Sequence, residues 1–340
     1  MKRCKKCGLP ETYTNIRFNR QGICNYCEFY ESHRDVLENK ENLEQIFLEK
    51  MEAGKKKAKE AGSKYDCLAG FSGGKDSTYI IYQLKEKYGM RVLAFTFDNG
   101  FSTEYGKNNI KNALEKLKVD HITFSMNDES LRKQYTACVK LMHNFCSVCF
   151  HNMHYYSYLF AAQNKIPLII NGRTKGQILQ CADSTKGIEP FESSYHLKEF
   201  EYQMFHGLEE RADKAGRMDY LKDVEAEAVS YFAYHDISEE DTMKFLEEKI
   251  GWMRPKGASA HADCFAHVMA ENMSLEKKGL PIRTGELAVS VRRGELSIEE
   301  AEKMAQEDKE NFKEVPEDVK NKFYERISVK KNGRTGKNGL

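Results

Sequence analysis

The chain has 340 residues, of which 40% are hydrophobic and 31% charged, and 53 basic residues nearly balance 52 acidic ones. This composition excludes a mainly disordered chain, and the charge balance argues against a surface dominated by basic residues for nucleic-acid binding. No apolar run approaches the roughly 18–20 residues that span a bilayer, and the start lacks the apolar stretch of a secretory signal. We therefore expect a cytoplasmic protein with no membrane partner.

The residue pattern divides the chain into five parts. Paired cysteines mark a head over residues 1–30, and a stretch rich in Glu and Lys over 31–62 carries apolar residues at helical spacing, which predicts one connecting helix. We expect an α/β domain over 63–235 and a helical C-terminal part over 236–330. The Lys- and Gly-rich residues 331–340 are expected to be a frayed tail.

Short apolar runs alternate with helical patterns in the α/β part. Strands are predicted at residues 65–71, 91–97, 121–124 and 167–171, and helices at 77–88, at 106–118 and from near Cys149. This alternation predicts a mostly parallel sheet with helices on both faces. In the C-terminal part, Ser238 and Ser297 each stand three residues before an acidic residue, which is typical of a helix start.

The hexapeptide Ser72-Gly73-Gly74-Lys75-Asp76-Ser77 joins the first predicted strand to the next helix. Two glycines let the backbone turn tightly and approach phosphate oxygens, and the amides at a helix start attract an anion. Lys75 adds a positive charge, and the Asp76 carboxylate can help to hold Mg²⁺. The loop is not a Walker A motif, because an aspartate follows the lysine.

This hexapeptide resembles the PP-loop of the N-type ATP pyrophosphatases, also called adenine nucleotide alpha hydrolases. The resemblance implies a parallel α/β fold that binds ATP and adenylates a substrate oxygen. Pyrophosphate leaves, and a nitrogen or sulfur nucleophile then displaces AMP. Residues 72–77 would hold the pyrophosphate part, with Lys75 and Asp76 in catalytic roles, and Asp98, after the second strand, would lie near the nucleotide.

A further candidate for phosphate binding follows the strand at 167–171. Gly172, Arg173 and Lys175 occupy the loop there, and ligands of parallel sheets bind at the carboxyl ends of the strands. Arg173 and Lys175 can contact phosphate from this position. A solvated basic loop is the alternative.

The head contains two Cys-x-x-Cys pairs, Cys4 with Cys7 and Cys24 with Cys27. Their separation falls within the window of about 15–20 residues that zinc ribbons use, so the pattern predicts a closed, structural Zn²⁺ site. The wording Cys24-Asn25-Tyr26-Cys27 resembles the head of N-acetyl sugar amidotransferases, which are PP-loop enzymes of surface-polysaccharide biosynthesis. Archaeal-type transfer-RNA thiolation enzymes also carry a zinc ribbon before a PP-loop.

A second set consists of Cys146, Cys149 and the distant Cys264. It resembles the PP-loop sulfur transferases, in which such a trio binds a [4Fe-4S] cluster, and this resemblance implies catalytic and cluster-binding roles for all three. A redox pair, a zinc site that includes His151 or His154, and inert packing are the alternatives. Cys67 and Cys138 are interpreted as packing residues. Cys181 is interpreted as a thiol without a special role, with a persulfide carrier as the alternative.

Two enzymatic hypotheses follow, beside a third in which the chain is a nucleotide-binding regulator with a zinc head. The favoured one is a thiolation in which sulfur replaces the activated oxygen, with a sulfur-donor protein as partner. The alternative is an amidotransferase for a nucleotide-linked N-acetyl sugar, with ammonia from a partner glutaminase. A transfer-RNA substrate is not favoured, because the tail lacks a second zinc ribbon. The family resemblance also implies a homodimer.

Overall fold

The protein is described from a computed structural model, in which residues 2–140, 144–180, 226–254 and 263–328 are described. Cys181 and the predicted frayed tail at 331–340 lie outside these residues. No described helix combines the length and the apolar character that a membrane crossing requires.

The strands form one parallel sheet in the order β3-β2-β1-β4-β5. Their bounds are Cys67–Gly70 for β1, Val92–Asp98 for β2, Asp120–Ser125 for β3, Leu168–Asn171 for β4 and Glu227–Ser230 for β5. Central strand β1 is buried, with Cys67 opposite Val92 on one side and Leu168 on the other. The predicted parallel α/β fold is confirmed, and β5 is an edge strand that the sequence pattern did not indicate.

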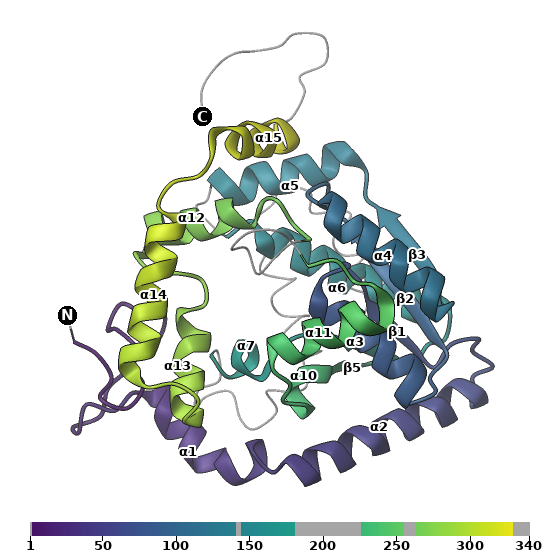
Figure 1. Cartoon of the computed structure of the whole chain (residues 1–340), viewed down its shortest axis with the longest axis horizontal. Helices are drawn as coiled ribbons and strands as arrows, with labels where there is room; N and C mark the ends of the chain where they lie inside the picture. The colour runs from purple at the N-terminus through teal and green to yellow at the C-terminus, as the bar shows by residue number, and fades with distance from the viewer. Residues whose placement is uncertain (1, 141–143, 181–225, 255–262, 329–340) are drawn as a thin grey trace, which may run out of the picture.

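Helices cover both faces of this sheet (Figure 1). Alternate residues of β1 separate the two sides: Cys67 and Ala69 pack with residues of α2, α3 and α4, whereas Leu68 packs with residues of α5 and α6. The bounds are Lys40–Glu60 for α2, Lys75–Tyr82 for α3, Glu104–Leu117 for α4, Asp128–Lys140 for α5, Cys146–Gln163 for α6 and Lys175–Leu179 for α7. Cys67 and Cys138 are buried, as expected of packing residues.

The predicted connecting helix over 31–62 is wrong as a single element. The structure has α1 at Asn25–Leu37 and then α2, and α1 begins inside the head. The side chain of Asn39 caps α2 by accepting a hydrogen bond from the Asn42 amide at 3.1 Å. An asparagine at this position favours a new helix start over continuation, because its oxygen satisfies an amide that would otherwise lack a partner.

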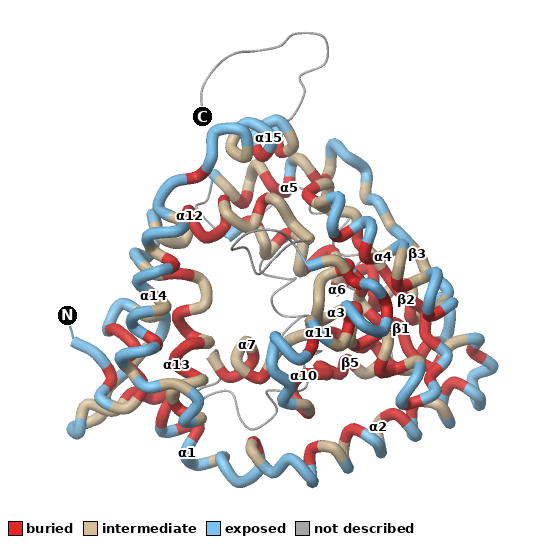
Figure 2. Tube along the Cα trace, viewed as in Figure 1, coloured by how far each residue is buried: buried red, intermediate tan, exposed pale blue. Residues whose placement is uncertain are grey.

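The C-terminal part is helical, and its later helices form the left and upper rim of the molecule in Figure 1. Its elements are α10 (Tyr231–Tyr234), α11 (Glu239–Ile250), α12 (His267–Lys278), α13 (Thr284–Arg293), α14 (Ile298–Phe312) and α15 (Glu317–Ile327). Both predicted helix starts are confirmed: Ser238 accepts from the Asp241 amide and Ser297 from the Glu300 amide, each at 3.1 Å. Buried residues gather in the strands and on the inner sides of these helices (Figure 2).

Candidate functional site

The hexapeptide lies between β1 and α3, at the carboxyl edge of the sheet, where the PP-loop resemblance places it. Gly73 adopts φ +79°, and a Cβ atom there would collide with the carbonyl oxygen of Gly106 in α4. The Ser72 amide donates to Ser77 Oγ at 3.2 Å, and the two hydroxyl oxygens are also 3.2 Å apart. The turn is thus closed by its own serines, with Gly74 as the residue that precedes α3.

Lys75 faces two carboxylates in this structure. Its Nζ atom lies 2.9 Å from Asp76 Oδ2 and 3.4 Å from Glu239 Oε1, at the start of α11. Burial acts to lower the pKa of Lys75, but the charges of Asp76 and Glu239 outweigh burial and raise it. The ammonium group is therefore charged, as phosphate binding requires.

Trp252 makes a further contact with the backbone of the hexapeptide loop. Its Nε1–H group donates to the Gly73 carbonyl oxygen at 3.0 Å, and the side chain is only 4% exposed. Because a buried carbonyl needs a hydrogen-bond donor, this contact helps to fix the path of the loop backbone.

The segment that contains Cys264 also reaches this edge of the sheet. Ser102 and Cys264 form an antiparallel bridge, flanked by a bond from the Thr103 amide to the Asp263 carbonyl and one from the Phe265 amide to the Phe101 carbonyl, each 3.0 Å long. Residues 101–103 follow β2, whose last residue is Asp98. A distant part of the chain is thereby placed beside the predicted nucleotide site.

The three cysteines of the second set lie in the same part of the fold, because each packs against one core cluster. All three are half-buried against the core cluster beneath α6, and Tyr135 Oη lies 2.9 Å from Cys149 Sγ. Burial raises the pKa of Cys146 well above its ordinary value, and the charges of Cys149 and Cys264 raise it further. Burial and the charge of Cys149 likewise raise the pKa of Cys264 to about 12.

The histidines beside this set are buried and neutral. Burial lowers the pKa of His151 to about 4 and that of His154 to about 3. Among the described residues, the compact group of side chains that could hold a single metal ion is formed by the head cysteines and includes neither histidine. A zinc site built from His151 or His154 with the second cysteine set is therefore not formed in this structure.

The other residues predicted to contact the nucleotide differ in how close they lie to the hexapeptide. Asp98 caps the turn after β2 by accepting from the Gly100 amide at 3.0 Å, and a Cβ at Gly172 would lie 3.6 Å from Asp76 Cβ. Gly172 therefore lies beside the hexapeptide 72–77. The Arg173 guanidinium lies 5.8 Å from the ring centre of Phe150 in α6, on the side of the second cysteine set.

Lys175 does not have the predicted phosphate role in this structure. It is 2% exposed, and its Nζ atom donates to the Leu37 carbonyl at 3.0 Å and lies 3.4 Å from both Glu38 and Asp236. Arg293 pairs with the same two carboxylates. This ion network connects α1, α7 and α13, so the charge of Lys175 is used within the fold.

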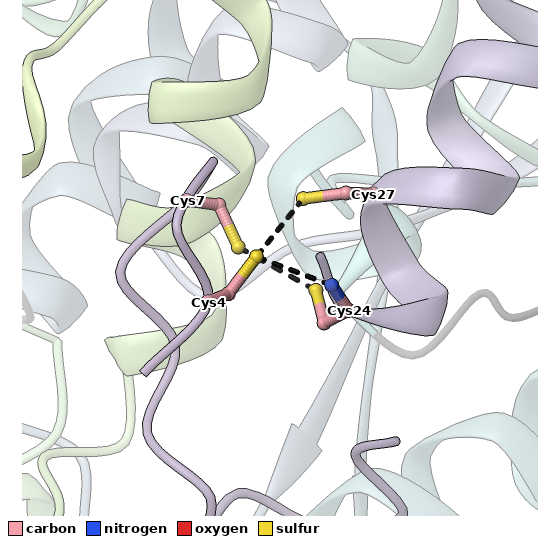
Figure 3. Close-up of side chains that lie close together, drawn as sticks. All are labelled: Cys4, Cys7, Cys24 and Cys27. Carbon is pink, nitrogen blue, oxygen red and sulfur yellow. Dashed lines mark hydrogen bonds between the residues drawn. The ribbon is translucent and has the colours of Figure 1, made fainter. Parts of the chain in front are cut away.

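The head brings four buried thiols into one group (Figure 3). Cys4 Sγ is 3.7 Å from Cys27 Sγ, Cys7 Sγ is 3.7 Å from Cys24 Sγ, and all four sulfur atoms lie within 4.8 Å of one another. Thiolates bound at about 2.3 Å to one tetrahedral ion are about 3.8 Å apart, so the group fits a single ion such as Zn²⁺. A [4Fe-4S] cluster fits less well, because each of its thiolates binds a different iron and the sulfurs lie farther apart.

Comparison with known proteins finds distant similarities. No protein-family model matches the chain. A stretch of 62 residues is 37% identical to the uncharacterized protein MJ1599 of Methanocaldococcus jannaschii; it covers 18% of this chain and only 22% of that protein.

Two solved structures are similar at low identity. One is the U34-tRNA thiolase NcsA from Methanococcus maripaludis with its [4Fe-4S] cluster, with a TM-score of 0.37, 18% identity, and coverage of 90% of this chain and 89% of that chain. The other is the NH3-dependent NAD synthetase from Campylobacter jejuni, with a TM-score of 0.31, 15% identity, and coverage of 54% of this chain and 93% of that chain. The fold of this chain is defined by its own strand order and by the loop between β1 and α3.

Proposed function

We propose that the protein is an ATP-dependent enzyme that adenylates a carbonyl oxygen of its substrate and releases pyrophosphate. The observation that supports this most is the hexapeptide 72–77 at the carboxyl edge of a parallel sheet, with charged Lys75 at the start of α3. The backbone amides and the serine hydroxyls of this turn can donate hydrogen bonds to the oxygens of the leaving pyrophosphate. No protein nucleophile is needed for this half-reaction.

The chain's own residues stabilise the charge that develops as pyrophosphate leaves. The loop amides and the Lys75 ammonium would bind its oxygens, and the N-terminus of α3 adds its dipole. Asp76 is a hard carboxylate beside this anion site, which fits a Mg²⁺ ion. When bound, Mg²⁺ neutralises phosphate charge.

The second half-reaction that we favour introduces sulfur. Its support is that Cys146, Cys149 and Cys264 pack against one core cluster, with Cys264 bridged to Ser102 in the segment after β2. The three thiolates would be ligands of a [4Fe-4S] cluster and would leave one iron without a protein ligand for sulfur chemistry. Tyr135 holds Cys149 in place through the contact between Oη and Sγ.

The alternative is amidation, in which ammonia displaces AMP. It is supported by the wording of the head around Cys24 and Cys27, which resembles amidotransferases of N-acetyl sugars. Its substrate would be nucleotide-linked, with a glutaminase as partner. The sulfur route instead needs a sulfur-donor protein, and for either route we propose a homodimer acting on a small or nucleotide-linked acceptor.

Anaerobic purification followed by iron and sulfide analysis separates the two routes. Thiolation predicts a brown protein that loses colour and activity in Cys146→Ala, Cys149→Ala and Cys264→Ala. Cys138→Ala is the matched control, because this thiol is buried in the same core cluster but is assigned no role. A colourless protein that releases pyrophosphate with ammonia would instead establish amidation.

Pyrophosphate release tests the activation step that both routes share. Lys75→Ala and Asp76→Ala are expected to abolish release, measured with ATP and an acceptor, while the far-ultraviolet circular dichroism stays unchanged. Release at the normal rate in either variant would refute the assignment of the loop.

A further inference from the structure

Asp263 is held directly over the phosphate loop. Its Oδ2 atom lies 3.2 Å, and its Cγ atom 3.4 Å, from the position that a Cβ atom of Gly74 would occupy. The Cα atom of Asp263 is equally close to the corresponding position at Gly106 in α4. Glycine at both places lets this carboxylate approach the start of α3 more closely than any other residue would allow.

The backbone of Asp263 cannot easily withdraw from this place. The Thr103 amide donates to its carbonyl oxygen at 3.0 Å, and the bridge between Ser102 and Cys264 follows immediately. The carboxylate itself has no hydrogen bond or ion pair with any residue in the described ranges. This half-buried carboxylate therefore lies beside the loop with its oxygens available to a cation.

A bound polyphosphate would bring like charges together here. The loop amides and Lys75 attract phosphate oxygens, and the Asp263 carboxylate carries the same sign of charge as those oxygens. Repulsion between like charges acts at this short range. Nucleotide and carboxylate are compatible when a divalent cation lies between them.

We propose that Asp263 binds the divalent cation of Mg–ATP, so that the segment containing Cys264 also supplies an oxygen ligand to the nucleotide's metal. The proposal rests on the proposed function, since it assumes that ATP binds at residues 72–77. Carboxylate oxygen is the ligand type that Mg²⁺ prefers. Asp76, in the first turn of α3, offers a second carboxylate beside the loop.

The test is calorimetric binding of α,β-methylene-ATP, which cannot be cleaved between its α and β phosphates, with Mg²⁺ or with EDTA. The full-length wild-type protein is expected to bind the Mg²⁺ complex at least about tenfold more tightly than the metal-free analogue. In Asp263→Asn this ratio falls about tenfold or more, because metal-free binding strengthens while Mg²⁺-dependent binding weakens. Electron paramagnetic resonance of Mn²⁺ in the complex should lose a coordination contact in the same variant.

Glu104→Gln is the matched control. It removes a carboxylate from the first turn of α4, where Glu104 is exposed and paired with Lys107 at 2.9 Å, and its Mg²⁺ preference should equal that of the wild type. Asp263→Ala, with thermal unfolding measured for every variant, separates lost ligation from lost folding. Equal tightening with and without Mg²⁺ in both Asp263 variants would show mere repulsion and overturn the proposal.

An unchanged ratio in folded Asp263 variants would also overturn it, while the proposed function would survive because the wild type still binds the analogue. Failure of the folded wild-type protein to bind the analogue under either condition would instead refute the proposed function itself.

Discussion

The Nη2 atom of Arg292 lies 3.8 Å from the Sγ atom of Cys7, across 285 residues of sequence. The arginine is 5% exposed and its Nε atom has no hydrogen-bond partner, while its guanidinium also lies 5.7 Å from the ring centre of Tyr26. Four thiolates on one divalent ion carry a net negative charge, and burying such a charge requires compensation. Arg292 in α13 is placed to provide it.

Arg292→Met should weaken metal binding by the head roughly tenfold, because it removes the buried cation but keeps the length of the side chain. A chelator competition that follows zinc release measures this directly. Arg34→Met, at an exposed position in α1, is the control and should retain the metal as the wild type does. Equal retention by the Arg292 variant would show that the charge is compensated elsewhere.

Trp252→Phe should destabilise the protein by about 1 kcal/mol and weaken binding of the ATP analogue a few-fold, because the Gly73 carbonyl loses its donor. Trp252 is the single tryptophan of the chain. In the wild type, its fluorescence should therefore change when the analogue binds to the loop. Fluorescence that is insensitive to a bound analogue would contradict the proposed position of the nucleotide.

Gly73→Ala should abolish binding of the analogue and lower stability by several kcal/mol, since the new methyl group meets the Gly106 carbonyl. Gly62→Ala is the matched control: Gly62 also has positive φ, at +66°, but a Cβ atom there meets open space. It should cost only about 1 kcal/mol. Chemical denaturation of both variants separates backbone strain from collision, and equal losses would contradict the close packing of the loop on α4.

Glu286 in α13 should make stability depend on pH. Burial raises its pKa from 4.5 to about 7, opposed by a hydrogen bond from Thr174 and by the charge of Arg283, while Glu239 and Glu271 raise it further. Between these two pH values the folded state holds a proton that the unfolded state has released. The contribution of Glu286 to the free energy of unfolding therefore falls as pH rises from about 4.5 to about 7.

Glu286→Gln should remove this dependence. The variant is expected to be more stable than the wild type at pH 8, by on the order of 2 kcal/mol, and similar to it at pH 4.5. Urea denaturation at both pH values measures the difference. A constant gap between the two proteins across this range would contradict a raised pKa at Glu286.

Local patterns predicted much of the framework. The strand before residue 72, the glycine turn and the helix after it could be predicted because each depends on residues that are consecutive in the sequence. The same holds for the starts of α11 and α14 at Ser238 and Ser297. The four cysteines of the head are recognisable because two short pairs must meet to complete a tetrahedral site. In each case, residues close in sequence determine the structure or the spacing itself states the chemistry.

Contacts between distant segments could not be predicted from the sequence. Trp252, Asp263 and Arg292 owe their roles to partners far away, and no periodicity indicates which partner each will meet. Strand β5 is four residues long and is defined by pairing with β4, which no local preference reveals. The break before α2 did have a local signal in Asn39, because an asparagine ahead of a helical pattern favours a new start.

The bridge between Ser102 and Cys264 has a consequence for recombination among related proteins. A C-terminal half transplanted from another chain would carry its own version of residues 263–265, and these would have to fit a turn inherited from the recipient. A chimera would then need two recombination crossovers, whereas exchange of an independent C-terminal domain would need one. The turn after β2 and the segment beside it should accordingly be exchanged as a pair in any chimera that is meant to work.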